Sequence, residues 1–593
     1  MQPPRNECLM RRLLVAVLVV HVMMVAWSAT KHSPGVDEPA HLAAGLSYWH
    51  LGRFDLYRVN PPLVELLATS PLLVLKPKLD WGSYDDSPGT RSEFEVGLDF
   101  VYTNRDKFMS YLIVARWACI PFTVIGGIFV FRWGNELFGP QAGFLATCLW
   151  CFSPAVLGNA PMVTADVPSA AMGVAASFYF WRWTNRRTLR SACFVGLVFG
   201  FALLTKSTWI VNVVIWPLLS IWNWFKSGEK NNRLQDVLQI GAIMTVAVYV
   251  LNLGYCFEGS MQYLGDYKFV SDALKGPDAY ARYSFDNRFR DGLLHWLPLP
   301  FPSSFVRGID EQKRDFELGN WSYALGQWQE RGWWWYYLLA ASVKLPTGVL
   351  CLAAFSVVSV LRRHTHLELN SAMHLASTPL LLFVLASANA GLSRYYRYLL
   401  PLLPFLFVLA AGGIASSSIR TRLLAKVFAF WAIASSVWYF PHSMSYFNEL
   451  AGGPRNGHKV LVDANIDWGQ DLLYLRDKLR ALGVEDCQIA FFGVLIPQDV
   501  GMSTDLPPIA EPDTRFVTLE PGWYAVSVNF VQGYPYPAAG ADEYLRGIPL
   551  NGLAYFQQLT PVDSAAFSIN IYKVESRLEI PIILPVRSGS STH

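Results

Sequence analysis

The run M-S-Y-L-I-V-A-R-W-A-C-I-P-F-T-V-I-G-G-I-F-V-F at residues 109–131 is long enough and apolar enough to cross a bilayer as a helix. Ten further apolar runs surround it, so we predict eleven spanning helices. Their ranges are 11–29, 109–131, 140–158, 163–183, 191–205, 208–225, 236–256, 335–360, 371–389, 396–415 and 424–441. Backbone groups in hydrocarbon must be satisfied within the chain, and this condition predicts helices. The sequence therefore indicates an α-helical polytopic membrane protein.

The composition of the 593-residue chain agrees with this class. Hydrophobic residues make up 52% and charged residues only 16%, against roughly 25% charged in ordinary soluble domains. The net charge of +3 is small, which argues against a nucleic-acid partner. The charge is uneven, however, because the part from Ser443 onward carries −7 and the rest +10.

The loops between the runs give an orientation. Lys and Arg cluster in alternate loops, and these clusters all fall on one side when every span is counted. The clusters are Arg5, Arg11 and Arg12; Arg132; Arg182, Arg186, Arg187 and Arg190; Lys226, Lys230 and Arg233; Arg362 and Arg363; and Arg420, Arg422 and Lys426. The positive-inside rule makes that side cytoplasmic. We therefore predict a multi-pass protein of the cell membrane, with its N-terminus inside and its C-terminal part outside.

The first run has a second interpretation. It is short and ends in small residues around Ala26–Ser28, so it also fits a cleaved signal peptide. Cleavage would remove one anchor without changing the sidedness of the rest.

Two domains are predicted. Residues 1–442 form the polytopic domain, with outer loops at 30–108 and 257–334 and an interfacial helix around 62–75. Residues 443–593 form an outer α/β domain: K-V-L-V-D-A at 459–464, I-A-F-F-G, Y-A-V-S-V-N-F-V and A-F-S-I-N-I-Y-K-V read as strands. Asp467 to Leu482 reads as a helix that Gly483 ends, and Asp467 and Gln470 have capping-box spacing.

Charged residues occur at the predicted outer ends of spans, where the positive-inside rule does not explain them. They are Asp37, Glu38, Asp166, Lys206, Arg394 and Arg397. Charges close to hydrocarbon are costly, so a functional role is the first hypothesis. Carboxylates and cations that converge on one membrane face suit an anionic lipid headgroup and a proton-accepting group.

Each of these residues also has a structural interpretation. Lys206 could extend to the interface as a snorkelling side chain, and Asp166 could cap a helix. His41, three residues after Glu38, could orient a carboxylate, bind a metal or simply be solvated. The cysteines at 119, 148, 151, 193 and 351 lie inside apolar runs, no Cys/His metal spacing is present, and only Cys256 and Cys487 could plausibly meet outside the membrane.

The order of these motifs resembles a known family. V-D-E-P-A-H at 36–41, N-P-P-L at 60–63, Asp166, T-K at 205–206 and R-Y-L-L-P-L-L-P at 397–404 look like the GT-C membrane glycosyltransferases, in the branch of the protein O-mannosyltransferases and aminoarabinose transferases. L-P-L-P-F-P, Y-A-L-G-Q, G-W-W-W-Y-Y, V-K-L-P and D-A-N-I-D-W-G-Q-D-L are similar to a bacterial subgroup of this branch. The resemblance covers nearly the whole chain.

The resemblance implies an inverting transfer of a sugar from a polyprenyl-phosphate carrier to an acceptor hydroxyl. By position, Asp37 would be the base and Asp166 a second acidic residue, while Lys206, Arg394 and Arg397 would contact the carrier phosphate. Some members use a divalent metal and others none. Trp333-Trp334-Trp335 lacks the Asp of the oligosaccharyltransferase W-W-D signature, and this departure argues against an oligosaccharide donor.

In the tail, Trp468, Asp463 and Asn465 are candidate acceptor contacts, although a structural role is the first interpretation. Two other functions compete with the transferase. A flippase for a lipid-linked sugar would also need cations near a phosphate, but it has little need of the Asp37-Glu38 pair and usually shows related halves. A non-catalytic scaffold that presents the tail is the third. The sugar, the acceptor (protein, lipid or glycan) and the metal are not determined by the sequence.

Overall fold

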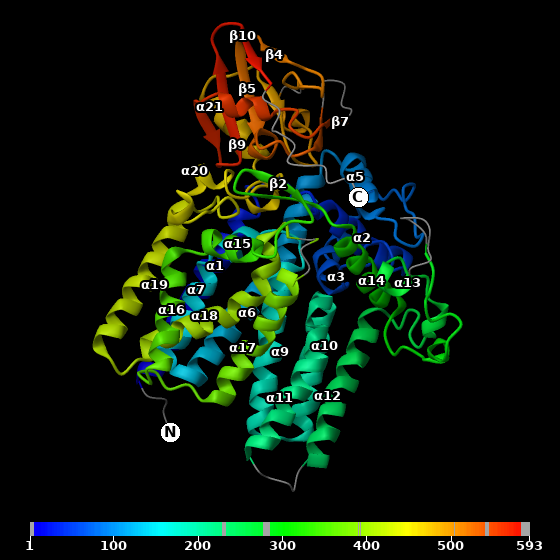
Figure 1. Cartoon of the computed structure of the whole chain (residues 1–593), viewed down its shortest axis with the longest axis vertical. Coiled ribbons are helices and arrows are strands. Elements are labelled where there is room, and N and C mark those ends of the chain that lie inside the picture. Colours follow the sequence, from blue (N-terminus) through cyan, green and yellow to red (C-terminus); the bar gives the residue numbers. More distant parts are fainter. Residues whose placement is uncertain are drawn as a thin grey trace, which may run out of the picture.

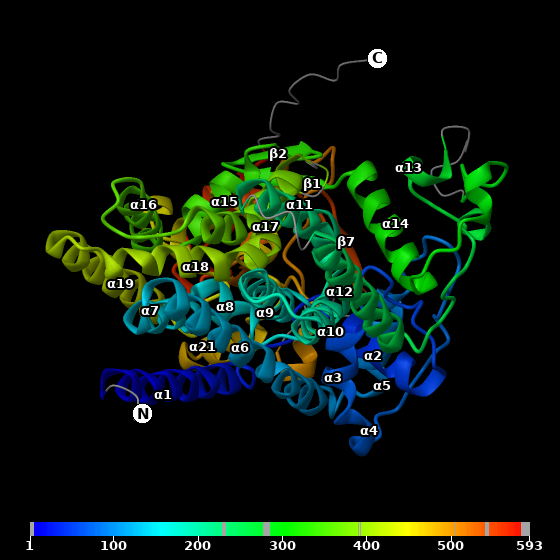
Figure 2. The ribbon, with the colours of Figure 1, turned by 90° about the horizontal axis from the view of Figure 1, so that it is seen from below.

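The computed structural model describes residues 5–227, 233–276, 285–388, 391, 393–502, 505–539 and 545–582. A bundle of long helices occupies one end of the molecule, and a strand-containing domain formed by the C-terminal residues sits on the other end (Figure 1). Helical loops lie between them. The view from below shows α1 at the edge of the bundle, next to α6 and α7 (Figure 2).

The bundle consists mainly of long apolar helices. They are α1 (Arg5–Ser28), α6 (Phe108–Phe138), α7 (Pro140–Cys151), α8 (Pro154–Asn159), α9 (Asp166–Asn185), α10 (Leu189–Thr205), α11 (Asn212–Ser227), α12 (Arg233–Gly254), α15 (Tyr336–Lys344), α16 (Thr347–Leu361), α17 (Leu369–Ala388), α18 (Leu403–Ala411) and α19 (Ile419–Tyr439). Short 3-10 segments, η1 (Ser207–Val211), η5 (Tyr396–Leu402) and η6 (Gly412–Ala415), extend α11 and α18.

Among the described residues, six helical segments are long and apolar enough to cross a membrane. They are Leu9–Ser28, Phe108–Phe138, Ser207–Phe225, Arg233–Gly254, Leu369–Ala388 and Tyr396–Ala415, and a bent pair, α15 with α16, makes a seventh if it counts as one span. The protein is therefore a polytopic helical membrane protein, and the count of eleven stays a prediction.

Two predicted spans are interrupted by prolines. The third, 140–158, stops after the 12 residues of α7 and restarts at Pro154 as α8, with Ser153 extended between them. The eighth bends by 108° between α15 and α16, where Leu345 is extended before Pro346. A proline disfavours the helical conformation in the residue before it, which explains both breaks.

Two long loops cover the end of the bundle that carries the C-terminal domain. The first loop (residues 30–108) contains α2 (Glu38–Leu51), α3 (Leu63–Thr69), α4 (Leu72–Leu75) and α5 (Glu93–Thr103), so the predicted interfacial helix is α3 and α4 together. The second loop (257–334) contains η2 (Leu264–Asp266), α13 (Asp272–Lys275), η3 (Leu293–Trp296), α14 (Ser303–Leu318) and the hairpin β1 (Trp321–Ala324) and β2 (Gln327–Glu330).

The C-terminal domain contains a four-stranded sheet in the order β3-β5-β9-β8, formed by Gln488–Ala490, Gly522–Ser527, Ile569–Val574 and Asp563–Ala565. β3 pairs in parallel with β5, and the other pairs are antiparallel. Two smaller sheets pair β4 (Phe516–Leu519) with β10 (Leu578–Pro581) and β6 (Tyr536–Ala539) with β7 (Leu545–Ile548). β3, β5 and β9 fall on the predicted strands around 489, 524 and 569, but the prediction was wrong for the second half of Y-A-V-S-V-N-F-V, where Val528–Val531 form the short helix α22.

The start of this domain differs from the prediction. Residues 459–464 form turns and the 3-10 segment η8 (Asp463–Asn465) rather than a strand, and the helix α21 spans only Leu472–Ala481. The capping box was therefore wrong: the cap residue of α21 is Asp471, and Asp467 and Gln470 bond to backbone N–H groups of the preceding turn. Gly483, at φ 68°, does end the helix region.

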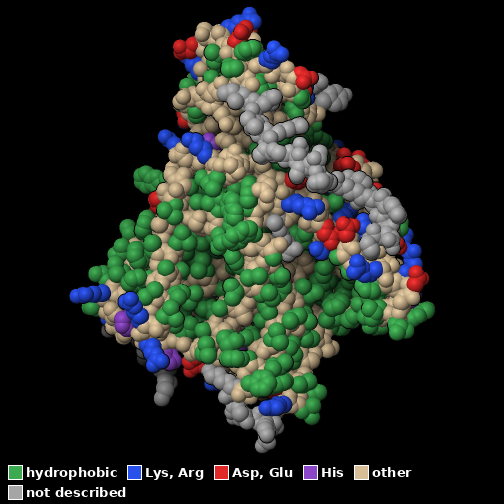
Figure 3. All heavy atoms as spheres, viewed as in Figure 1, with side chains coloured by type: hydrophobic (Ala, Val, Ile, Leu, Met, Phe, Trp, Pro, Cys, Tyr) green, Lys and Arg blue, Asp and Glu red, His purple; other side chains and the backbone are tan. Residues whose placement is uncertain are grey.

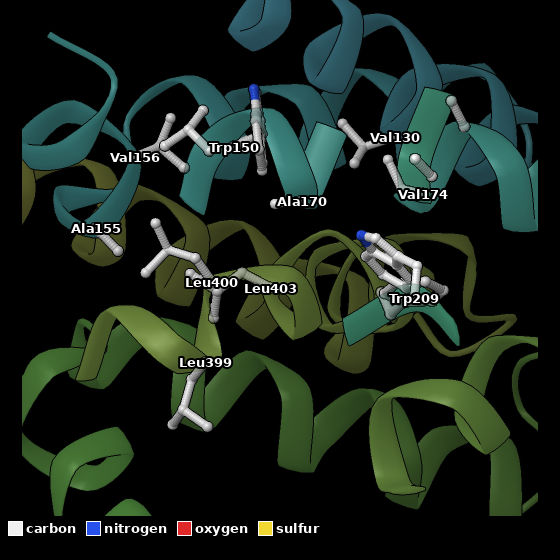
Figure 4. Close-up of a cluster of buried hydrophobic side chains, with 14 of the residues drawn as sticks. Val130, Trp150, Ala155, Val156, Ala170, Val174, Trp209, Leu399, Leu400 and Leu403 are labelled. Carbon is white, nitrogen blue, oxygen red and sulfur yellow. The ribbon is translucent and has the colours of Figure 1, made fainter. Parts of the chain in front are cut away.

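The core of the bundle is apolar and aromatic. Trp150 of α7 and Val130 of α6 face Ala170 and Val174 of α9, with Leu400 and Leu403 on the opposite side (Figure 4). α9 therefore lies at the centre of the bundle, and this position brings its first residue, Asp166, to the covered end.

Candidate functional site

Four charged side chains form a connected chain where α2, α9, α10 and η5 meet. The Arg397 guanidinium donates to Asp37 at 2.9 Å and lies 3.9 Å from an Asp166 oxygen. Lys206 donates to the other oxygen of Asp166 at 2.6 Å. The four side chains are 6% to 18% exposed. Their charges alternate in sign and sum to zero. This pairing offsets the cost of removing the four charges from water.

Backbone breaks place all four groups. Asp37 is the residue before α2, and Asp166 is the first residue of α9 rather than its cap, which is Ala165. Lys206 has an extended backbone between α10 and η1. Arg397 lies in the first turn of the 3-10 segment η5. Helix ends and breaks from distant parts of the chain therefore meet at one point.

Aromatic rings cover the cations. The Arg397 guanidinium carbon lies 3.9 Å from the ring centroid of Trp468 and 4.7 Å from that of Tyr395, and Lys206 lies 5.2 Å from that of Tyr398. Cation–π contacts of this kind hold a guanidinium in a plane without consuming its N–H donors. The Arg397 Nε is in fact buried and has no hydrogen-bond partner among the described residues.

Glu38 has a different environment from its neighbour Asp37. Its carboxylate is fully buried and bonds to the Arg116 guanidinium (Nε at 2.8 Å) and to the backbone N–H groups of Gly35 and Val163, each at 2.8 Å. Arg116 also donates to the carbonyls of Ala29, just before the first loop, and of His32 and Ser33 within it. Glu38 and Arg116 therefore fix the loop that carries Asp37. Arg116 was missed by the sequence analysis, although a lone arginine inside an apolar run is the signal that marks it.

His41 bonds to Glu65 through its Nδ1 at 2.8 Å, and both side chains are buried. The imidazole faces Tyr57 at 4.9 Å between ring centroids. Burial raises the pKa of Tyr57, and the nearby Asp37 carboxylate raises it further. Among the described residues, no three His, Cys, Asp or Glu side chains are grouped to hold a metal ion. Because Asp37 and Asp166 are held by cations, the residues present do not fit a divalent metal.

Arg394 belongs to a neighbouring pair. Its Nε donates to Asp463 at 2.6 Å, and its guanidinium lies between the rings of Tyr395 and Tyr534. Asn465 holds this corner through bonds to Tyr396 N–H (2.8 Å) and the carbonyl of Arg394 (2.9 Å). Asp463 and Asn465 therefore contact the backbone and the cation of the 394–397 segment.

The tail enters the site directly. The Trp468 carbonyl accepts from Val36 N–H and that of Gln470 from Ser33 N–H, both at 3.0 Å. These bonds tie residues 468–470 to the loop that carries Asp37. Asp467 is buried beside these bonds. Burial raises the pKa of its carboxyl group to about 8, and the negative charges of Asp471 and Asp463 also raise it. The sequence suggested Trp468 for this region, but it did not place the ring on Arg397.

A small apolar cavity of about 90 Å³ adjoins the segment that carries Asp37. Val36, Pro39 and Ala40 form one wall, and residues 491–497 and Tyr536 of the C-terminal domain form the other. Burial raises the pKa of Tyr536, and the negative charge of Asp37 raises it further. The Asp37 carboxylate is therefore close to this wall of the cavity. The cavity therefore lies between the segment that carries Asp37 and the C-terminal domain.

Comparison with known proteins gives one family. The family model described as dolichyl-phosphate-mannose-protein mannosyltransferase matches residues 108–252, which hold α6 to α12 and two of the four charged residues, Asp166 and Lys206. No curated protein matches the chain by sequence. The match supports the class that the sequence motifs indicated, a membrane glycosyltransferase of the GT-C class.

Two solved structures resemble the fold distantly. ArnT from Cupriavidus metallidurans, bound to undecaprenyl phosphate, is 12% identical with a TM-score of 0.44, over 90% of this chain and 96% of that one. The apo oligosaccharyltransferase from Archaeoglobus fulgidus is 11% identical with a TM-score of 0.42, over 91% and 75%.

Proposed function

We propose that this protein is an inverting glycosyltransferase that moves a sugar from a polyprenyl-phosphate carrier to an acceptor hydroxyl on the outer face of the membrane. The observation that carries the proposal is the Asp37–Arg397–Asp166–Lys206 chain of charges at the covered end of the bundle. The family match over residues 108–252 supports a lipid-carrier glycosyltransferase. The sequence resemblance agrees with both.

The two cations suit the carrier phosphate. When the sugar leaves, the bond from its anomeric carbon to the phosphate oxygen breaks, and the electron pair stays on the phosphate. Negative charge therefore develops there in the transition state, where positioned cations lower the barrier. Arg397 already presents a buried Nε without a hydrogen-bond partner among the described residues, and a phosphate oxygen is a suitable acceptor for it.

Asp37 suits the proton transfer. A phosphate that takes Arg397 as its partner leaves the carboxylate of Asp37 free to accept a hydrogen bond from the acceptor hydroxyl. The hydroxyl oxygen then bonds to the anomeric carbon while its proton passes to Asp37. Glu38 is unsuited to this role, since both of its oxygens are held by Arg116 and backbone N–H groups. Its role is to position the loop.

Among the cations, the contacts favour Arg397 and Lys206 over Arg394. The sequence made all three candidates for the carrier phosphate, but in the structure Arg394 is engaged with Asp463, whereas Arg397 and Lys206 are bound to the two candidate acidic residues. Arg394 then serves to hold the tail segment against the 394–397 segment. The acceptor would approach Asp37 from the side on which the apolar cavity lies.

The proposal is tested in cells that lack the protein. Loss of the transferase should cause its polyprenyl-linked sugar to accumulate, and mass spectrometry of the lipid extract would identify the sugar. Wild-type protein should remove the accumulated lipid and Asp37→Asn should not. Asp106→Asn, an exposed carboxylate of the same loop, is the matched control.

A flippase or a scaffold gives a different result. A flippase has no proton to accept, so Asp37→Asn would restore the wild-type lipid pattern at normal protein level. If the purified protein moves a labelled carrier lipid between the two leaflets of a vesicle and does not transfer the sugar, its function is transport and the proposed function is wrong.

A further inference from the structure

The second loop carries an apolar patch that none of the roles above explains. We define the loop patch as the exposed side chains of Phe257, Met261, Tyr263, Leu293, Leu294, Trp296 and Leu297. Leu293 is 98% exposed and Trp296 69% exposed, and none of the four residues of η3 is buried. Soluble surfaces rarely expose so many large apolar side chains together, and such patches mark contact surfaces.

The patch is held in a defined shape. Residues 261–264 run beside residues 297–299, with Met261 N–H bonded to the Leu299 carbonyl and Leu264 N–H to the Leu297 carbonyl, both at 2.9 Å. The rings of Tyr263 and Trp296 meet edge to face at 5.7 Å. The exposed side chains therefore project from an ordered ribbon whose backbone is hydrogen-bonded.

The patch continues the apolar surface of a predicted span. Tyr249 and Leu253 in the last turns of α12 are 58% and 55% exposed, and the ring of Tyr249 contacts that of Phe257 at 5.7 Å. In the space-filling view, hydrophobic side chains cover the helices and continue along the lower edge of the protrusion that the second loop forms at the right (Figure 3). The exposed apolar side chains at the end of α12 therefore lead into the patch through Tyr249 and Phe257.

Charged groups of both signs lie in the same loop. Lys268 lies over the Phe285 ring at 5.1 Å, and Arg290 pairs with Asp286 at 2.7 Å. Arg288 donates to a backbone carbonyl. Tryptophan and tyrosine are the residues that proteins place at the membrane–water interface, where charged side chains beside them can reach the lipid headgroups.

We propose that the loop patch lies in the interfacial region of the bilayer, in the leaflet where α12 ends, and anchors the second loop to the membrane. Continuity with α12 selects lipid over a soluble partner. The anchor bears on the site because the same loop leads into α14: Asn252 donates to the Pro300 carbonyl at 2.9 Å, and Glu311 of α14 pairs with Arg58 of the first loop at 2.7 Å. A loop held at the lipid surface keeps α14 against the first loop.

The experiment places an environment-sensitive fluorescent amino acid at position 293 of the full-length protein. The protein is reconstituted in phosphatidylethanolamine–phosphatidylglycerol vesicles, with or without brominated phosphatidylcholine, which quenches fluorophores in the bilayer. Position 253 in α12 is the positive control, and position 482, an exposed leucine of the C-terminal domain, is the negative control. We expect quenching and a blue shift at 293 close to those at 253.

A label at position 296 repeats the measurement and guards against a local effect of one substitution. Emission at both positions that matches position 482 would overturn the proposal. Quenching that disappears when the protein is diluted among the vesicles, together with cross-links between copies through position 293, would instead assign the patch to a second copy of the chain. Both results are independent of whether the protein transfers a sugar.

Discussion

Arg397 donates a 2.9 Å hydrogen bond to Asp37 although 360 residues separate them in the chain. The pair joins the first loop to the segment before α18, and Asp166 and Lys206 extend it into the bundle. In the proposed reaction, the carrier phosphate would offer Arg397 and Lys206 a new anionic partner and so rearrange this neutral chain of charges.

Asp37→Asn is expected to lower turnover on the order of 10²–10⁴-fold, the usual contribution of a positioned base. The amide can still accept from Arg397 but cannot take up a proton. Turnover measured with the accumulated lipid donor checks this. Wild-type turnover in Asp37→Asn, together with lost turnover in the folded fraction of Glu38→Gln, would transfer the role to Glu38.

Glu38→Gln should affect folding rather than chemistry. Removing the charge leaves Arg116 buried without its counterion, and breaking such a pair typically costs about 3–5 kcal/mol. We expect a lower level of folded protein in the membrane and a lower thermal midpoint in detergent. The folded fraction should keep its donor KM, and a loss of turnover at full stability would contradict the positioning role.

Arg397→Ala should raise the apparent KM for the lipid donor more than Arg394→Ala does. Of these two arginines, Arg397 pairs with Asp37 of the site, whereas Arg394 pairs with Asp463. Arg397→Lys should recover part of the effect, since lysine supplies charge but not the planar fork. Initial rates over a range of donor concentrations distinguish the variants. Equal donor dependence in Arg397→Ala and the wild type would remove this residue from the phosphate site.

Asp467 should make stability depend on pH. Its pKa is about 8 in the folded protein against an ordinary value of 3.8, so the folded state holds the proton more tightly. Its contribution to stability is therefore fully present below about pH 4 and is lost as the pH rises towards 8. Asp467→Asn should flatten the dependence of the thermal midpoint on pH across this range. Asp477→Asn, an exposed carboxylate, is the control and should leave the slope unchanged.

Trp468→Ala should lower turnover without abolishing it, and Trp468→Phe should restore most of it. The ring stacks on Arg397 at 3.9 Å, so it positions the cation. Turnover is compared at matched membrane levels. Complete loss in both variants, with unchanged fold and donor KM, would instead support direct contact with the acceptor.

The predicted topology has its own test. A reporter fused after residue 593 should be active outside the cytoplasm if eleven spans are present, because an odd number of crossings separates the two termini. A reporter active in the cytoplasm would show that one predicted span does not cross, and the interrupted segments α7–α8 and α15–α16 would be the first candidates.

The sequence by itself determined the class of protein and the residues of interest. Apolar runs in lipid can only become helices, since no water satisfies their backbone groups, and α6 at 108–138 follows the run that predicted it. Strands at 522–527 and 569–574 were likewise readable from their apolar and β-branched residues. Charges beside hydrocarbon marked Asp37, Asp166, Lys206 and Arg397, because their cost demands a reason.

Only the tertiary structure decided which charge meets which. Glu38 and Asp37 are neighbours in the chain, yet one is buried on Arg116 and the other lies on Arg397. Residues 459–464 look like a strand, but they pack as turns against the bundle, where Asp463 and Asn465 find partners near Arg394. Local patterns fix the periodicity of a segment, whereas ion pairs between segments hundreds of residues apart depend on how helix ends and proline breaks meet in space.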